Sequence, residues 1–167
     1  MTGTDVKLDA AAVEATLSAP PEFILDLQLA FETPSPRDLL ELWGARRNGA
    51  GLPSRDDFSF DDLRPYFGHL CIVDVLPEID DLRFKLVGTV IVETVGRDAT
   101  GMLVSDVLPE PALRIYRYLI QNATPARTHG RVEWRDKEFI SHETLLLPLA
   151  ADGAAVDQFL LMMSFLD

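Results

Sequence analysis

Two runs of the chain are apolar on both faces of an extended strand, and they constrain the fold more than any other feature. The first run is Leu70–Leu76, in which Asp74 is the one charged residue, and the second covers residues 159–166. Side chains of a strand alternate between its two faces, so a strand that is apolar at successive positions is covered on both sides. We therefore expect these segments to be interior strands of a sheet with other elements packed on both faces.

Two further segments show the alternation of a half-buried strand. In residues 82–88, apolar residues alternate with Arg83 and Lys85 until Gly88 ends the run. In residues 127–134, polar side chains recur at every second position, which predicts an edge-like strand with one face in solvent.

Helical signals occupy the regions between the strands. Ser35 as a cap, Pro36 in the first turn and Asp38 at the third position of a capping box predict a helix over about residues 36–48. Trp43 on its apolar stripe is interpreted as a packing anchor. Residues 111–122 show the same spacing, with Leu113, Tyr116, Leu119 and Ile120 as the apolar positions.

The N-terminal region differs from the rest. Residues 1–21 are rich in Ala, Thr, Asp and Pro and predict a mobile tail. Residues 22–32 are apolar nearly all round, which we interpret as a helix that must be covered on more than one side. It would lie across the outer face of the sheet, pair with another chain, or do both.

Composition limits the functional classes. The 167 residues suffice for one domain with a short extension, and no apolar run reaches the length of a transmembrane helix. The first residues lack a signal-peptide pattern, and the single cysteine, Cys71, fits a reducing cytoplasm. The net charge of −12 argues against a nucleic-acid partner, because phosphate binding needs clustered Lys and Arg.

The stretch of residues 82–108 reads LRFKLVGTVIVETVGRDATGMLVSDVL. Together with Leu52-Pro53-Ser54-Arg55, Phe67-Gly68-His69-Leu70, Leu145-Leu146-Leu147-Pro148-Leu149 and Asp152-Gly153, its layout resembles the sensory PAS domains, and in particular a single-domain subfamily best known from alphaproteobacteria. The resemblance covers roughly residues 37–167. It implies an α+β fold, a five-stranded antiparallel sheet with helices on one face, preceded by an N-terminal helical extension. The expected division is residues 1–34 for the tail and apolar helix and 35–167 for the sensor domain.

The resemblance also decides residues 89–95, whose β-branched composition by itself extends the preceding strand. In PAS domains the chain turns here into a short helix, which implies Thr89 as its cap and Gly96 just past its end. The first and last strands are expected to be adjacent in the middle of the sheet. A ligand cavity is implied between the sheet and the 111–122 helix.

For that cavity we predict an apolar lining with one polar group at the mouth. The expected lining residues are Phe84, Tyr116, Ile120, Trp134 and Met162, with the choice of Met162 over Met163 not fixed by the pattern. Arg97 is the expected polar anchor, since its guanidinium can bind a carboxylate or phosphate. The favoured alternative is that Arg97 and Asp98 tie their loop to a neighbouring element.

The pattern assigns no cofactor. His69 is an axial haem ligand or, more simply, a residue that turns the chain. The Asn-Cys-Arg-Phe-Leu-Gln motif of light-sensing PAS domains is absent, so flavin is not supported, and Cys71 is interpreted as a small buried hydrophobe. His129 and His142, near Glu138 or Glu143, form a metal site or are exposed strand residues, and we favour the latter.

The sequence thus predicts a cytoplasmic, non-enzymatic regulator that binds a small molecule. No output domain is recognised within these residues, so the signal is expected to pass to another chain, as a homodimer formed through residues 22–31 and the outer sheet face or with a separate signalling protein. The alternatives are a ligand-free docking scaffold with a filled core and a small acid–base enzyme that uses Asp74 or Glu143.

Overall fold

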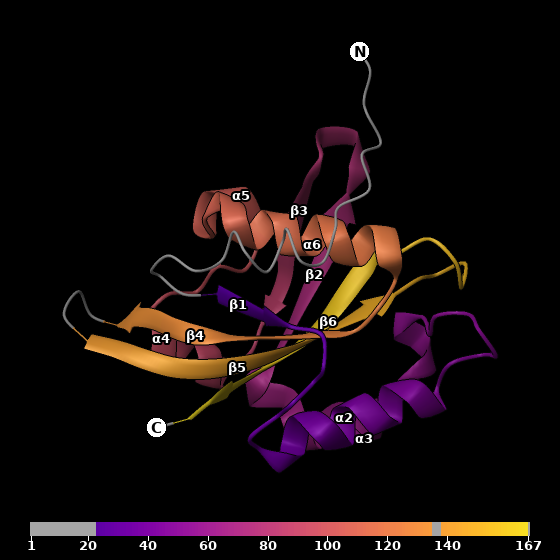
Figure 1. Cartoon of the computed structure of the whole chain (residues 1–167), viewed down its shortest axis with the longest axis horizontal. Helices are drawn as coiled ribbons and strands as arrows, with labels where there is room; N and C mark the ends of the chain where they lie inside the picture. The colour runs from indigo at the N-terminus through magenta and orange to yellow at the C-terminus, as the bar shows by residue number, and fades with distance from the viewer. Residues whose placement is uncertain (1–22, 135–137, 167) are drawn as a thin grey trace.

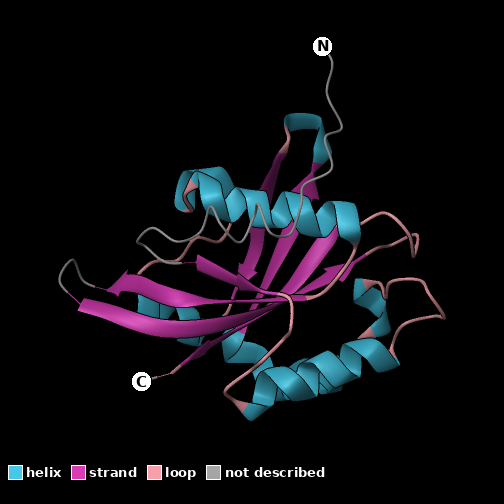
Figure 2. Ribbon diagram, in the orientation of Figure 1, coloured by secondary structure: helices cyan, strands magenta, loops and turns pink. Residues whose placement is uncertain are grey.

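The computed structural model describes residues 23–134 and 138–166 and shows one antiparallel sheet with helices on both faces (Figures 1 and 2). The sheet has six strands in the order β1-β4-β5-β6-β2-β3. The strands are β1 (Phe23–Asp26), β2 (Leu70–Leu76), β3 (Asp81–Val87), β4 (Ala126–Trp134), β5 (Glu138–Leu149) and β6 (Gln158–Phe165). The predicted α+β class is confirmed, with one strand more than expected.

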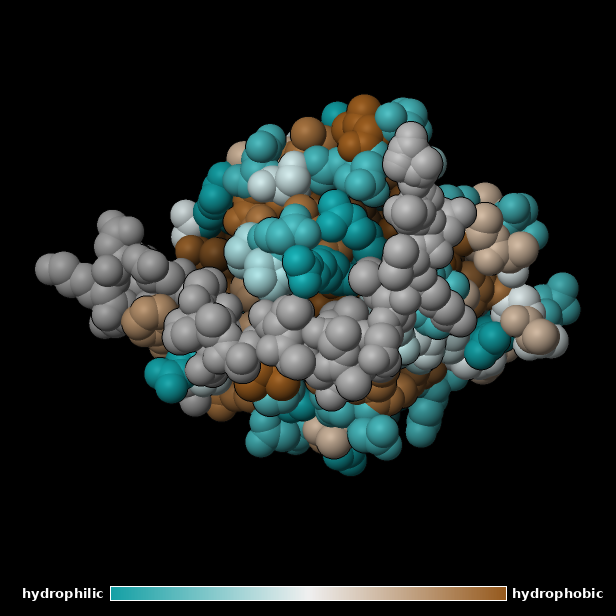
Figure 3. Space-filling model, turned by 45° about the horizontal axis from the view of Figure 1, so that its top comes forward, coloured by the Kyte–Doolittle hydropathy of each residue, from teal (hydrophilic) through white to brown (hydrophobic). Residues whose placement is uncertain are grey.

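The helices divide between the two faces of the sheet. The α-helices are α2 (Pro34–Ala45), α3 (Phe60–Leu63), α4 (Thr89–Val95), α5 (Val104–Val107) and α6 (Glu110–Asn122), and short 3₁₀ turns are η1 (Arg55–Asp57), η2 (Arg64–His69) and η3 (Pro77–Ile79). Helix α6 lies across one face, which we call the cavity face, and α2 lies across the opposite, outer face (Figure 2). Seen from above α6, hydrophilic residues lie over much of the visible surface, with hydrophobic residues showing between them (Figure 3).

The two apolar runs are adjacent interior strands, as predicted. Strands β2 and β6 pair antiparallel, with Cys71 opposite Leu161 and Ile72 opposite Leu160. Val73 and Leu160 have no exposed surface. Continuous apolar sequence therefore marked the strands that are buried on both sides.

The predicted helix over residues 22–32 is wrong. Residues 23–26 form β1, which pairs antiparallel with β4, and the chain then turns sharply. The Asp26 carboxylate accepts bonds from the amides of Gln28 (2.8 Å) and Ala30 (2.9 Å), and Leu29 has a φ of 58°. A side chain that bonds amides two and four residues later stabilises a turn in place of a helix.

This strand also changes the interpretation of β4. Because β1 pairs along it, β4 is an interior strand, and the prediction of an edge with one solvated face is wrong. Arg127 and Thr128 are both 5% exposed. The sheet edges are β1 and β3.

Helix α2 covers the outer face, which removes the reason for expecting a second subunit there. Its Leu39 is fully buried and Trp43 is 3% exposed, while Phe31, just before the helix, is 1% exposed. The Trp43 indole N–H donates to the carbonyl of Pro148 at 2.9 Å, so Trp43 is the packing anchor that the sequence predicted. The outer face of the sheet is therefore covered by the same chain, whereas the prediction of a dimer assumed that a second subunit covers it.

The start of α2 differs from the prediction. The helix begins at Pro34 with Thr33 as the N-cap, so Ser35 does not cap it. The hydroxyl of Thr33 instead donates to the carboxylate of Glu143, 2.5 Å away. A tertiary contact has replaced the local cap.

Helix α4 spans the predicted residues, and Gly96 ends it with a left-handed φ of 81°. Its N-cap is Gly88 in place of Thr89. A Cβ on Gly88 would lie 2.3 Å from the carbonyl oxygen of Gly68, so the two backbones pack in direct contact. That contact seats α4 against η2.

No helix in the described part of the chain is long and apolar enough to cross a membrane.

Candidate functional site

A cavity of about 160 Å³ lies between the cavity face of the sheet and helices α4, α5 and α6. Its helical side is formed by Ile91, Val95, Val107, Ala112, Ile115 and Tyr116. Its sheet side includes Cys71, Phe84, Thr128, Thr144, Leu146 and Leu161. The walls are thus mostly apolar, with a few hydroxyl groups from β4 and β5.

The structure brings together only part of the predicted lining. Phe84 and Tyr116 lie in the wall, and Arg97 lies at its margin. Ile120 lies instead in a separate surface depression between η3 and α6. Met163 lines the cavity, so Met162, its neighbour in a strand, points to the opposite face. The side chain of Trp134 lies outside the described residues.

Arg97 is poorly placed to anchor a ligand deep in the cavity. It is exposed, and its guanidinium contacts the sulfur of Met102 at 3.7 Å. Asp98 does not pair with it, because its carboxylate accepts bonds from the Thr100 amide (3.0 Å) and hydroxyl (2.6 Å). The favoured alternative, a pair that ties the loop to another element, is therefore wrong for Asp98, which closes its own turn.

The most unusual polar group in the cavity wall is His142 on β5. Its side chain is 1% exposed, and its Nε2 is a buried polar atom that has no hydrogen-bond partner among the described residues. The other ring nitrogen, Nδ1, lies 3.2 Å from the hydroxyl of Thr144. Gly130 sits opposite His142 and Phe23, so the two rings approach to 5.8 Å without a side chain between them.

Apart from Arg97 at the margin, the ionisable groups of the wall are uncharged at neutral pH. Burial lowers the pKa of His142 to about 4, with the positive charges of His129 and Arg127 acting in the same direction. Burial raises the pKa of the Cys71 thiol to about 12 and also raises that of Tyr116. A thiol in this state is not a nucleophile.

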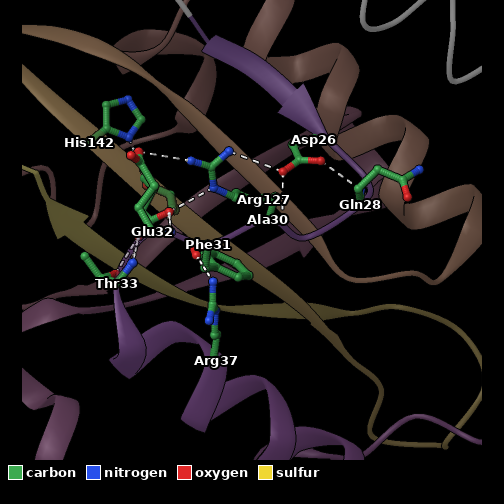
Figure 4. A network of polar contacts seen from close by, with 11 residues as sticks. Asp26, Gln28, Ala30, Phe31, Glu32, Thr33, Arg37, Arg127 and His142 are labelled. Carbon is green, nitrogen blue, oxygen red and sulfur yellow. Dashed lines mark hydrogen bonds and ion pairs between the residues drawn. The ribbon is translucent and has the colours of Figure 1, made fainter.

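On the outer face, directly behind this wall, lies a network centred on Arg127 (Figure 4). Its guanidinium contacts Glu143 at 2.9 Å, Asp26 at 3.2 Å and Glu32 at 3.6 Å. Glu143 also accepts bonds from the amides of Glu32 (3.0 Å) and Thr33 (2.8 Å). We call Asp26, Glu32, Thr33, Arg127 and Glu143 the Arg127 network; it fixes the β1–α2 connection to β4 and β5.

Hydrogen bonding keeps the two central carboxylates of the network ionised. Burial alone would raise the pKa of Glu143, but bonds from Thr33, Glu32 and Arg127 outweigh it and lower the pKa. The pKa of Asp26 is likewise lowered, by the amides of Ala30 and Gln28 and by Arg127, against the effect of burial. Glu143 has no exposed surface, so its charge is balanced entirely by these partners.

The residues considered for a metal site do not lie together, and those considered for acid–base catalysis do not line the cavity. His129 pairs opposite Glu143 on the outer face, whereas His142 faces the cavity, so the two histidines cannot share a metal ion. Among the described residues no three metal-ligating side chains cluster. Asp74 accepts a bond from Gln158 at 2.7 Å, and neither it nor Glu143 lines the cavity. The prediction that His142 is an exposed strand residue is wrong.

The cavity does not fit a flavin or a haem. Sites for drug-sized ligands occupy about 300–1,000 Å³, and this cavity of about 160 Å³ is smaller. The imidazole of His69 lies outside the cavity wall, with Nδ1 3.0 Å from the carbonyl oxygen of Met163. We therefore assign neither group to the site.

Comparison with known proteins agrees with this architecture. The sequence model of the PAS domain matches residues 31–164, and the chain therefore belongs to the PAS domain family. A fungal LOV domain photoreceptor aligns with 16% identity and a TM-score of 0.50, covering 78% of this chain and 91% of the other. At this identity it supports the fold alone.

Two other solved structures are similar at lower scores. The light state of the Aureochrome1 LOV domain aligns with 13% identity and a TM-score of 0.48, covering 65% of this chain and 88% of that one. An RNA-binding light-oxygen-voltage receptor aligns with 14% identity and a TM-score of 0.46, covering 81% of this chain and 34% of the receptor. A comparison with curated proteins found no match.

The wall residues that were not predicted from the sequence include His142, Thr144, Thr128 and Leu161. A usable signal was present in β5, where Leu146, Thr144 and His142 follow each other at every second position. Once one of them is placed under α6, strand alternation places the others on the same face. The sequence pattern, however, does not indicate which of the two faces of the sheet Leu146 occupies.

Proposed function

We propose that this PAS domain is a regulatory module that senses a small molecule bound in the cavity. The observation that carries the proposal is an apolar cavity of about 160 Å³ with one buried, unpartnered nitrogen in its wall. An engineered apolar cavity of about 150 Å³ in another protein binds benzene, so the volume here suits a single-ring molecule. Phe84 and Tyr116 of the predicted set are the proposed contacts, with Arg97 at the mouth.

The proposal favours a sensor over the alternatives. A docking scaffold needs only a filled core, whereas the core of this chain contains a cavity that a ligand can occupy. An acid–base enzyme needs a carboxylate at the ligand, and both Asp74 and Glu143 are engaged away from the cavity. Nucleic acid is not part of the proposal because the net charge is −12.

The signal is proposed to leave through association with another chain in the cytoplasm, either a second copy or a separate signalling protein. A ligand changes such association only by binding one conformation better than another. Strand β5 offers the connection, because His142 contributes to the cavity wall and Glu143 holds the β1–α2 connection. Light scattering at tens of micromolar with and without toluene measures the self-association; a monomer under both conditions excludes the homodimer.

Binding itself is tested by thermal unfolding in the presence of saturating toluene. A ligand that binds only the folded state increases the free energy of unfolding of the protein. An increase of about 1 kcal/mol corresponds to a rise in Tm of about 2–4 °C for a domain of this size. Ala112→Leu places a larger side chain in the wall and is expected to abolish the rise. Ala45→Leu, on the exposed part of α2, is the matched control and keeps it. An unchanged Tm in the wild type contradicts the proposal.

A further inference from the structure

The chemical class of the ligand follows from His142, and this inference rests on the proposed function. Nearly all buried polar atoms in proteins have a hydrogen-bond partner, and leaving one unpaired is costly. The Nε2 atom of His142 has no hydrogen-bond partner among the described residues, and His142 lies in the wall of the apolar cavity beneath α6. Because the His142 side chain lines this cavity, a ligand that occupies the cavity can supply the missing partner.

The role of Nε2 follows from its neighbour. Among the described residues, the hydroxyl of Thr144 contacts one hydrogen-bond partner, Nδ1 of His142, at 3.2 Å. If the hydroxyl donates to Nδ1, its own hydrogen is satisfied; if Nδ1–H donates instead, that hydroxyl hydrogen is left without an acceptor. The first arrangement leaves the proton on Nε2, so the imidazole offers a donor to the cavity.

Charge and size narrow the ligand further. The one charged side chain of the wall is Arg97, which is exposed at the margin and contacts Met102. The neutral imidazole of His142 cannot balance a buried carboxylate, and an unbalanced buried charge is strongly unfavourable. The volume of about 160 Å³ admits a ring with few substituents.

We infer that the cavity selects a compact, uncharged, single-ring compound with one oxygen acceptor, such as an aromatic ketone, and that this oxygen accepts a hydrogen bond from His142 Nε2–H. This assignment moves the polar anchor of the ligand from Arg97 at the mouth to His142 in the wall. The recognition is by one hydrogen bond in otherwise apolar surroundings, so the rest of the ligand is expected to be hydrocarbon.

The test uses acetophenone and isopropylbenzene, which have the same number of non-hydrogen atoms and differ in the carbonyl oxygen. Their affinities are measured by calorimetry for the wild type and for His142→Leu. The ratio of the two affinities, acetophenone over isopropylbenzene, is expected to fall at least tenfold in His142→Leu. The matched control is His129→Leu, which changes a histidine on the outer face of the neighbouring strand and leaves the ratio unchanged. Benzoate, the charged analogue, is expected not to bind.

The outcomes separate the two proposals. If neither aromatic compound binds the wild type, the cavity is not a binding site and the proposed function fails. If both bind and the ratio is the same in His142→Leu, the sensor stands but the hydrogen bond from His142 is refuted. If benzoate binds as well as acetophenone, the selection for an uncharged ligand is refuted. Should His142→Leu not fold, the imidazole ¹⁵N spectrum of the wild type decides: acetophenone must shift the Nε2 resonance of His142 and isopropylbenzene must not.

Discussion

His142 and Glu143 are neighbours on β5, yet their side chains serve opposite faces of the sheet. The imidazole of His142 lies in the cavity wall without a partner for Nε2, while the carboxylate of Glu143 is held by Arg127, Thr33 and the Glu32 amide. Successive strand residues necessarily point to opposite faces. One peptide unit therefore joins the cavity to the segment that connects β1 with α2.

The Arg127 network is predicted to be a major source of stability. Glu143→Gln removes the buried negative charge and leaves Arg127 partly unbalanced, so the free energy of unfolding should fall by about 3 kcal/mol. Asp61→Asn, which breaks the exposed pair with Arg64, is the control and should change stability by less than about 0.5 kcal/mol. Urea unfolding measures the free energy of unfolding of both variants. Equal losses would show that the buried charge of Glu143 contributes no more to stability than the exposed charge of Asp61.

The stability of the protein is predicted to depend on pH through His142. Its pKa is about 4 in the folded protein and about 6.5 when unfolded. Because the unfolded chain binds the proton more readily, stability is fully present above pH 6.5 and is lost as the pH falls towards 4. From pH 7 to pH 5 this group accounts for a loss of about 2 kcal/mol.

The variant His142→Leu should lack this part of the pH dependence. Urea unfolding of both proteins at pH 7 and pH 5 measures it, and the wild type should lose more stability than the variant over this interval. A parallel loss in the two proteins would mean that His142 is already protonated in the folded state or exposed to solvent.

The contact between Gly88 and Gly68 is predicted to tolerate no side chain. In Gly88→Ala the new Cβ overlaps the backbone of residue 68, which cannot move as a flexible side chain would, so the free energy of unfolding should fall by about 3 kcal/mol. Gly44→Ala is the matched control, since a Cβ there meets nothing within 4 Å. It should stabilise α2 by about 0.5–1 kcal/mol. Thermal unfolding of the two variants compares them, and a Gly88→Ala protein as stable as wild type would contradict the packing of α4 on η2.

The sequence predicted the features that depend on local pattern. The apolar runs identified β2 and β6, and Gly96 with the family resemblance identified α4 against a β-favouring composition. Residues 22–32 were misassigned because their apolar content has no helical period, and β1 forms only by pairing with β4, about a hundred residues later in the chain. That pairing is a tertiary effect.

The site was harder to predict than the fold because it depends on strand parity. Met162 and Met163 are equally apolar, and shifting the assignment by one residue moves every side chain to the other face. The same uncertainty prevented the prediction of His142 as a wall residue, because its apolar surroundings are formed by β1, β4 and α6, which are distant in the sequence. Ile120 was predicted to line the cavity for a related reason, but it lies on the side of α6 that faces η3.

The central claim is that small apolar molecules bind between the sheet and α6, and methyl NMR during a toluene titration tests it most directly. The account predicts that the methyl resonances of wall residues shift in a saturable way, whereas those of Leu145 and Leu160, buried but absent from the cavity wall, do not. The wall reporters are Ile91, Ile115, Leu146 and Leu161. Saturable shifts at Leu145 and Leu160 with none at the wall reporters, or no saturable shift at all, would contradict it.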